Sequence, residues 1–295
     1  MSSPTPRGSA QSSSATGQDE SLMVRPILFG IINITADSFS DGGRYLDPAA
    51  AIAAARRLTA EGADVVDLGA AASNIAAKPV APAEEIRRLE PVIAALKTAG
   101  IQVSIDSFSP ETQRFAIRQG VNFLNDIEGF SHPELYPDLA AAECRLVVMH
   151  AVQGRSRAQR VAVSPEAIWA RIVGFFAARI AALEAAGIDR ARLILDPGMG
   201  FFLSSDAKAS LRVLTGLTRL KREFGLPVLV SVSRKSFLAA VTGREAPEAR
   251  GPATLAAELY AAANGADYIR THDPGGLRDG LAVMAALAAE QDLAD

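Results

Sequence analysis

The chain has 295 residues, of which 49% are hydrophobic and 21% charged, and its formal net charge at pH 7 is −3. This length suits one large α/β domain or two small ones, and the slightly acidic balance excludes a general attraction to nucleic acids or anionic membranes. A single cysteine excludes an intrachain disulfide, and no apolar run reaches membrane-spanning length. Residues 1–22 are rich in Ser, Thr, Gly and Pro, so we expect a disordered leader before one domain at 23–295.

Short apolar runs alternate with helical segments through the rest of the chain. The apolar runs predict eight buried strands, at residues 26–33, 63–68, 102–106, 121–126, 145–150, 193–196, 227–232 and 266–271. Capping residues, helical spacing and Gly or Pro breaks predict helices at 48–61, 82–100, 109–119, 133–142, 164–187, 207–224, 235–242 and 252–264, and a last one from residue 277. Eight such units predict an α/β fold, the (β/α)8 TIM barrel, with a doubly wound open sheet as the alternative.

Each predicted strand closes on a polar or ionisable residue. In a barrel of this kind the strand ends converge on one mouth, where the active site lies. The strand-end residues that we expect to meet there are Asn33, Asp67, Asp106, Asn125, Asp196, Ser233, Arg270 and His272. Any one of them taken alone also fits a turn former or helix cap, and we expect His150, at the end of the fifth strand, to be a core histidine.

The acidic part of this set favours a ligand rich in hydrogen-bond donors. Asp67, Asp106 and Asp196 repel one another unless a cation or several donors lie between them. A site for metal alone would leave the amide of Asn125 unexplained. An amino-substituted heterocycle fits better, because Asp accepts its N–H groups while Asn both donates and accepts.

The opposite side of the predicted mouth is cationic. Arg234 and Lys235 follow the seventh strand, and Arg270 and His272 end the eighth. The loops after these two strands commonly bind phosphate in such barrels, and the turn that begins at Ser233 also opens a helix, whose amides favour anions. These residues predict a phosphate or diphosphate site.

The end of the first strand predicts a magnesium site. Asn33, with Thr35 and Asp37 beside it, supplies oxygens for a Mg²⁺ ion that keeps most of its water. The residues alone therefore predict a barrel enzyme that binds an amino-substituted heterocycle together with a phosphate or diphosphate.

Six segments resemble, in the same order, the motifs of dihydropteroate synthase. They are GIINITADSFSDGG at 30–43, VSID at 103–106, ND at 125–126, DPG at 196–198, SVSRKSF at 231–237 and RTH at 270–272. The resemblance covers about residues 27–289. It implies the condensation of 6-hydroxymethyl-7,8-dihydropterin diphosphate with p-aminobenzoate in folate biosynthesis, giving 7,8-dihydropteroate and diphosphate, in a cytoplasmic homodimer that uses Mg²⁺.

The same resemblance implies a role for individual residues. It places Asp106, Asn125 and Asp196 on the pterin edge, with Lys235 on the far side of the ring. Arg270 would stack over the pterin and meet the diphosphate together with His272, so that the catalytic residues are Lys235, Arg270 and His272. Further substrate contacts are expected from Ser73, Asp67, Ser233 and Phe201, and Asn33 would carry Mg²⁺.

Two departures from the family pattern point to its sulfonamide-insensitive (Sul) branch. The second loop usually reads GGESTRPG, whereas here it reads GAAASNIA at 69–76, so the Glu and Arg are absent. The usual Gly-Lys after the Asp-Pro-Gly motif is replaced by Phe202 and Leu203. Membership of that branch implies antibiotic resistance. We expect Phe201 to exclude the bulky end of a sulfonamide, and Phe202 to pack against the helix at 207–224.

Two other functions remain compatible with the sequence. A related pterin-binding barrel that transfers a methyl group from a folate to a corrinoid protein would share the acidic edge, but would not need the cations at 233–236 and 270–272. A non-catalytic pterin-binding barrel would tolerate the altered second loop.

Overall fold

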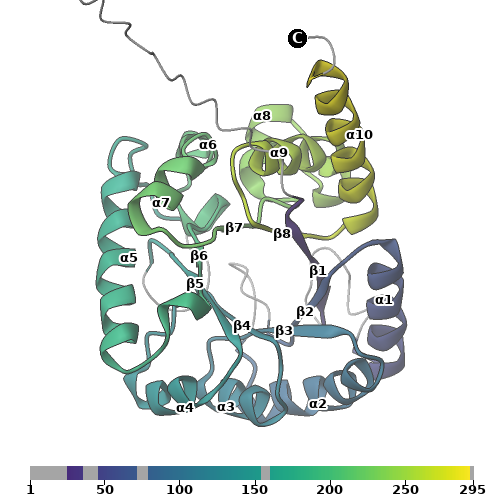
Figure 1. Cartoon of the computed structure of the whole chain (residues 1–295), viewed down its shortest axis with the longest axis vertical. Coiled ribbons are helices and arrows are strands. Elements are labelled where there is room, and N and C mark those ends of the chain that lie inside the picture. The colour runs from purple at the N-terminus through teal and green to yellow at the C-terminus, as the bar shows by residue number, and fades with distance from the viewer. Residues whose placement is uncertain (1–24, 36–45, 72–78, 154–159, 293–295) are drawn as a thin grey trace, which may run out of the picture.

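The computed structural model describes residues 25–35, 46–71, 79–153 and 160–292. Eight strands form its inner ring and helices surround them, so the predicted (β/α)8 barrel is confirmed (Figure 1). The strands are β1 (Ile27–Asn33), β2 (Val65–Gly69), β3 (Gln102–Asp106), β4 (Phe123–Asp126), β5 (Arg145–Met149), β6 (Leu193–Asp196), β7 (Leu229–Val230) and β8 (Tyr268–Thr271). The leader expected at 1–22 lies outside the described residues, and the single domain at 23–295 stays a prediction.

The strands pair in parallel in the order β6-β5-β4-β3-β2-β1-β8-β7. A bridge between Leu195 in β6 and Val228 joins the two ends of this order, and the Leu195 amide donates to the Pro227 carbonyl oxygen at 2.9 Å. The ring is therefore closed, which excludes the open sheet. Only Leu229 and Val230 pair regularly with β8, so β7 is shorter than the predicted strand at 227–232.

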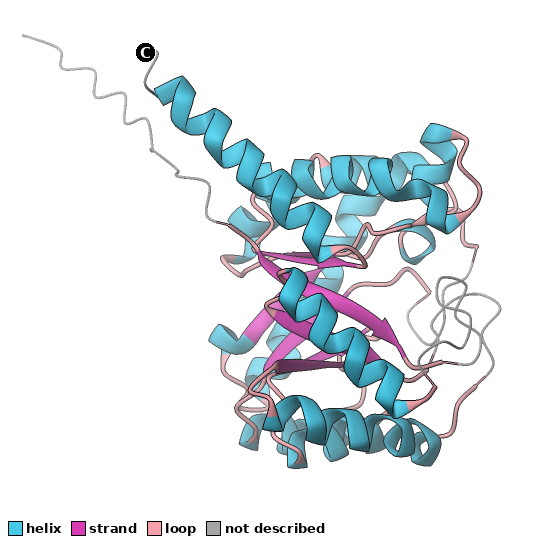
Figure 2. Cartoon of the chain, turned by 90° about the vertical axis from the view of Figure 1, so that its right-hand side faces the viewer, coloured by secondary structure: helices cyan, strands magenta, loops and turns pink. Residues whose placement is uncertain are grey.

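The helices begin at capping residues that the sequence displays. Asp47 accepts a hydrogen bond from the amide of Ala49, Ser109 from that of Thr112, and Asp206 from that of Lys208. The helices among the described residues are α1 (Pro48–Glu61), α2 (Pro82–Thr98), α3 (Pro110–Arg118), α4 (Tyr136–Ala141), α5 (Ile168–Ala185), α6 (Ala207–Leu214), α7 (Leu217–Phe224), α8 (Ser236–Thr242), α9 (Gly251–Ala263) and α10 (Pro274–Asp292). In the side view they cover the outside of the strands, and α10 extends beyond the barrel (Figure 2). Within the described chain, none of them combines the length and the apolar character needed to cross a membrane.

The single helix predicted at 207–224 is wrong, because the chain breaks between α6 and α7 at Gly216. The Trp169 ring on α5 occupies the space beside this glycine, and a Cβ there would lie 2.4 Å from Trp169 Cζ2. The ring also stacks against the Arg219 guanidinium, 5.3 Å from its centroid. The helix is therefore interrupted at a glycine against which the Trp169 ring packs closely.

The interior of the barrel is closed at one level by an apolar layer. Phe29, Val65, Phe123, Val147, Ile194, Leu229 and Tyr268 form this cluster, and seven of the eight strands contribute to it. Phe29 meets Phe123 edge to face with ring centroids 5.0 Å apart, an arrangement that aromatic quadrupoles favour. The layer is a solid floor, so that the polar residues further along each strand face the mouth.

We predict that Gly216→Ala lowers the free energy of unfolding by about 1–3 kcal/mol, because a methyl group cannot enter the space that Trp169 fills. Gly174→Ala is the matched control. That glycine lies inside α5, and no atom comes within 4 Å of the position that a methyl group would take, so alanine should stabilise the helix by about 0.5–1 kcal/mol. Urea unfolding of both variants measures the difference, and an unchanged midpoint for Gly216→Ala would contradict the role given to Trp169.

Candidate active site

A polar layer lies above the apolar floor at the carboxyl ends of the strands. Side chains alternate in and out of the barrel, so the residue two places after each floor residue faces the mouth. A cavity of about 20 Å³ at this level is lined by Asp106, Asn125, Ile127, Met149, Asp196, Met199, Phe202, Ser231, Lys235 and Arg270. This volume holds about one water molecule.

The lining combines residues that the sequence singled out with others that it did not. Asp106, Asn125, Asp196, Lys235 and Arg270 were predicted as site residues, and the fold brings all five to one cavity. The apolar part of the lining was missed. Its members, Ile127, Met149 and Met199, resemble ordinary core residues in the sequence, and only their place just beyond the strand ends could have revealed them.

Three acceptor-rich side chains share one wall of this cavity. Burial raises the pKa of Asp196 to about 6 and that of Asp106 to about 7, although nearby cations lower both. The Asn125 Oδ1 atom is buried and has no hydrogen-bond partner among the described residues. Unpaired buried acceptors are costly, so this wall is suited to a ligand that presents several N–H groups.

Asp196 is held by the turn that follows β6. Its Oδ1 accepts from the Gly198 amide at 2.8 Å. Gly198 has φ +74°, and a Cβ there would lie 2.4 Å from the His150 carbonyl oxygen, so the position requires glycine. His150 itself is buried and lies 3.1 Å through Nδ1 from the Pro197 carbonyl oxygen, as expected of a core histidine.

Arg270 crosses the mouth and joins three strands. Its Nε donates to Asp67 Oδ2 at 2.5 Å and its Nη2 to Asp106 Oδ2 at 2.6 Å. Asp67 is fully buried and lies behind Arg270 rather than on the cavity surface. Its contact with substrate stays a prediction, and in this structure the carboxylate binds the arginine.

Lys235 stands opposite the carboxylates. Burial, and then the charge of Arg270, lower its pKa to about 8, while Asp196 and Asp106 act in the other direction. Its Nζ atom lies 4.9 Å from the centroid of the Phe202 ring. Because burial has removed water from this ammonium group, an anion or hydrogen-bond acceptor that enters the cavity should bind it and raise its pKa.

His272 and Ser233 form a pair at the edge of the mouth. Ser233 Oγ lies 2.9 Å from His272 Nδ1 and accepts from the His272 amide at 3.2 Å. Burial, followed by the charges of Arg234, Arg270 and Lys235, lowers the pKa of His272 well below its ordinary value. The imidazole is therefore neutral at pH 7, ready to donate to an incoming anion.

Asn33 ends β1 beside this group. A Cβ placed on Gly69 would lie 3.6 Å from Asn33 Oδ1 and 3.9 Å from Asp106 Oδ2, so the amide oxygen faces the mouth next to β3. The nearby Thr35 hydroxyl is buried without a hydrogen-bond partner in the described part of the chain. No cluster of three His, Cys, Asp or Glu residues occurs in that part. These donors fit a hydrated Mg²⁺ bound mainly by water and substrate oxygens, and they do not form a dehydrating cage.

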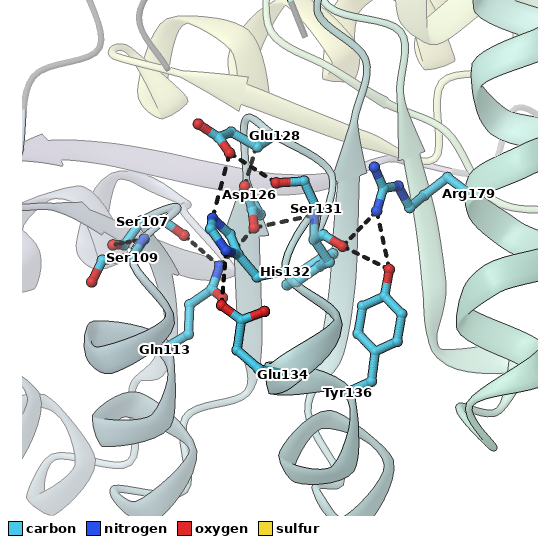
Figure 3. A network of polar contacts seen from close by, with 11 residues as sticks. Ser107, Ser109, Gln113, Asp126, Glu128, Ser131, His132, Glu134, Tyr136 and Arg179 are labelled. Carbon is cyan, nitrogen blue, oxygen red and sulfur yellow. Dashed lines mark hydrogen bonds and ion pairs between the residues drawn. The ribbon is translucent and has the colours of Figure 1, made fainter. Parts of the chain in front are cut away.

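A second network fixes the loop after β4. Asp126 accepts from the amides of Glu128 at 2.7 Å and Phe130 at 3.1 Å, and from Gln113 Nε2 at 2.8 Å (Figure 3). Phe130 holds a left-handed backbone, with φ +61°, and its carbonyl oxygen accepts from Arg179 at 2.7 Å. The network anchors the residue next to Asn125, so Asp126 supports the site from outside.

The neighbouring phenylalanines face different spaces. Phe202 lines the first cavity and packs with Ile127 and Met149. Phe201 lines a second cavity of about 300 Å³ and lies under the Arg160 guanidinium, 5.5 Å from the ring centroid. The second cavity also includes Ser236, the residue after Lys235 in the chain. Ser73, predicted to bind substrate, lies outside the described residues.

Comparison with known proteins agrees with this geometry. The family described as pterin binding enzyme matches residues 29–272. The chain is also 60% identical over 261 residues to dihydropteroate synthase type-2 of Escherichia coli, covering 88% of this chain and 96% of that protein. This chain belongs to the dihydropteroate synthase family. Its predicted membership is confirmed, and it is an enzyme that transfers an alkyl group other than methyl.

Solved dihydropteroate synthases share the fold. The Xanthomonas albilineans enzyme with 4-aminobenzoic acid is 36% identical with a TM-score of 0.77, covering 90% of this chain and 94% of that one. The Yersinia pestis enzyme in a sulfonamide drug complex is 30% identical with a TM-score of 0.83, covering 91% of this chain and 96% of that one.

We predict that Asp67→Asn lowers kcat/KM about 10- to 100-fold, because Arg270 loses one of its two charged partners. Asp138→Asn is the control. That aspartate pairs with Arg114 on the surface, where an ion pair contributes little, so its kinetics should match those of the wild type. Steady-state assays with unfolding measurements test both variants. An active Asp67→Asn enzyme would show that Arg270 needs no support from β2.

Proposed function

We propose that this dihydropteroate synthase condenses 6-hydroxymethyl-7,8-dihydropterin diphosphate with p-aminobenzoate, giving 7,8-dihydropteroate and diphosphate, while excluding sulfonamides. The observation that carries the proposal is the acceptor wall of Asp106, Asn125 and Asp196 opposite a cationic wall, with Asn125 Oδ1 buried and unpaired among the described residues. A pterin with its amino and ring N–H groups complements the first, and a diphosphate complements the second.

The acceptor wall orients the pterin. Asp196 accepts from the amino and ring N–H groups in the plane of the ring, and Asn125 takes up an N–H group and a ring nitrogen. Lys235 lies on the far side, where its ammonium donates to the ring. When the pterin enters, Arg270 exchanges part of its contact with Asp106 for stacking on the ring face. The cost of that exchange is small, because Asp67 keeps the arginine in place.

The cationic wall receives the leaving diphosphate. Arg270 and His272 donate to its oxygens as the bond between the pterin methylene carbon and the bridging oxygen breaks. Asn33 would hold Mg²⁺, with Thr35 beside it, and the ion when bound neutralises diphosphate charge. Ser233 orients His272 through Nδ1, so that the other ring nitrogen is free to meet the anion.

The aminobenzoate nitrogen then bonds to the methylene carbon. Departure of the diphosphate leaves a cation that the pterin ring delocalises, and the arylamine lone pair captures it. The nitrogen loses one proton after the bond forms. The arylamine is already neutral at pH 7, so the residues of this chain need only hold the two substrates in line.

The second cavity supports a place for the benzoate end. Its lining includes Phe201 and Ser236, each adjacent in the chain to a residue of the first cavity, and the charged residues Arg160, Arg250 and Glu245. A planar carboxylate fits beside the Phe201 ring, whereas a tetrahedral sulfonyl group with a bulky substituent collides with it. We therefore assign drug exclusion to Phe201, and Ser73 in the second loop is proposed as a further contact.

We predict that Phe201→Gly makes the enzyme sensitive to sulfamethoxazole while it still uses p-aminobenzoate. Phe202→Gly is the matched control, because its ring lines the pterin cavity and packs with Ile127 and Met149. That variant should turn over more slowly and remain resistant. Inhibition constants and the KM for p-aminobenzoate, measured on both, decide between the rings. If Phe201→Gly remains fully resistant, the assignment to Phe201 is wrong and the second loop becomes the candidate for excluding sulfonamides.

Assembly and location are further parts of the proposal. Tyr260 on α9 and Val283 and Leu287 on α10 are large apolar side chains with 41–61% exposure, and they support a homodimer that covers this face. The substrates are small molecules, with no nucleic acid or membrane as partner, and we place the enzyme in the cytoplasm. Residues 23–295 form its single domain.

The deciding experiment is complementation of a cell that lacks dihydropteroate synthase, with and without sulfonamide. The wild-type chain should restore growth in both media. Asp196→Asn should restore neither, because an amide turns a donor toward the pterin donors and costs about 1–3 kcal/mol of binding. Failure of a well-expressed wild-type chain to complement would refute the activity, and growth only without the drug would refute the exclusion.

A further inference from the structure

One face of α9 carries a column of buried polar residues. Arg250, which immediately precedes the helix, Thr254 and Glu258 are spaced four residues apart and so share a face. Their exposures are 7%, 5% and 1%. Charged side chains are seldom buried without a partner, so each member of the column should have a definite contact.

The first two members hold the turn that carries Lys235. Arg250 Nη1 donates to the Arg234 carbonyl oxygen at 2.7 Å, and the Arg234 amide donates to Thr254 Oγ1 at 3.0 Å. Arg234 has φ +58°, a left-handed conformation that non-glycine residues seldom adopt. The helix therefore holds the end of β7 in a backbone geometry that the chain would not choose by itself.

The third member, Glu258, faces the end of β8. Its carboxyl group interacts with the Thr271 hydroxyl, and its Oε1 atom has no hydrogen-bond partner within the described chain. Thr271 lies between Arg270 and His272. Because strand residues alternate, Thr271 points outward to α9 when its two neighbours point into the mouth.

Glu258 occupies a site that favours its neutral form. Burial raises its pKa to about 8, the Thr271 hydroxyl lowers it, and the charge of Asp273 at the start of α10 raises it. Two other charged side chains near this face are Arg250, which donates to backbone carbonyl oxygens, and Arg234 in the turn after β7. No cation among the described residues pairs with Glu258.

We propose that Glu258 is a positioning residue, which holds the end of β8 through Thr271 and thereby sets Arg270 and His272 for the diphosphate. The inference rests on the proposed roles of those two residues. With Arg250 and Thr254, it makes α9 the common support of both cationic strand ends. Ionisation of Glu258 leaves an unpaired buried charge behind the strand, which is relieved when the carboxylate moves toward water and releases Thr271.

The test compares Glu258→Gln with the wild type across pH 6 to 9.5. Glutamine keeps the shape and the hydrogen bond but cannot ionise. The ratio of kcat/KM for the pterin diphosphate, variant over wild type, should be constant near pH 6.5 and rise about threefold or more by pH 9. Other titrating groups, such as Lys235, cancel in this ratio. The KM for p-aminobenzoate should not differ between the two proteins.

Unfolding gives an independent readout. A carboxyl whose pKa rises from its ordinary 4.5 to about 8 on folding makes the protein less stable as pH increases between these values. As the pH increases from 5 to 8, the urea midpoint of Glu258→Gln should therefore rise relative to that of the wild type. This measurement tests whether the carboxyl group is buried in its neutral form. The kinetic ratio tests whether it positions the catalytic residues.

Two further variants complete the experiment. The first is the double variant Thr271→Val/Glu258→Gln, which is compared with Thr271→Val alone. Because valine cannot bind the Glu258 carboxyl group, the ratio of their kcat/KM values should not rise with pH. Glu248→Gln, an exposed acid just before α9, should give a ratio near one throughout. A flat ratio for Glu258→Gln, in a wild-type enzyme that turns over, overturns the inference. A wild-type enzyme without turnover overturns the proposed function instead.

Discussion

The ion pair of Arg270 with Asp67 and Asp106 is the interaction on which the rest of the mouth depends. It joins β8 to β2 and β3 across the open end of the barrel, with the arginine side chain only 13% exposed. Asp67 has no exposure at all, so its burial depends on the compensating charge of the arginine. Because the pair closes the barrel mouth, its neighbours are also withdrawn from water.

That withdrawal sets the charge of the whole site. Burial is the largest influence on the pKa of Asp106, Asp196, Lys235 and His272, and it moves each of them toward its neutral form. At pH 7 His272 is therefore neutral and Asp106 is close to its pKa, whereas Asp196 and Lys235 keep most of their charge. A pterin diphosphate supplies both the donors and the anion that these groups lack, so substrate and site complement one another.

Support for the two walls comes from different parts of the chain. The acceptor wall is held by turns close to it in sequence, where Gly198 binds Asp196 and the Asp126 network fixes the loop beside Asn125. The cationic wall is held from a distance, because α9 reaches the Arg234 turn and the strand that carries Arg270.

The sequence by itself determined the barrel and half of the cavity lining, including all of its ionisable residues. Strand-end polar residues such as Asp196 are local signals, since an apolar run followed by an acid and a Pro-Gly turn is compatible with few other local structures. Tertiary structure alone decided which contacts these residues make. Asp67 and Asp106 are alike in sequence and both pair with Arg270, yet only Asp106 lines the cavity. The close packing of Trp169 on Gly216 and the different cavities of Phe201 and Phe202 also depend on residues distant in the sequence. The local sequence does not predict such contacts.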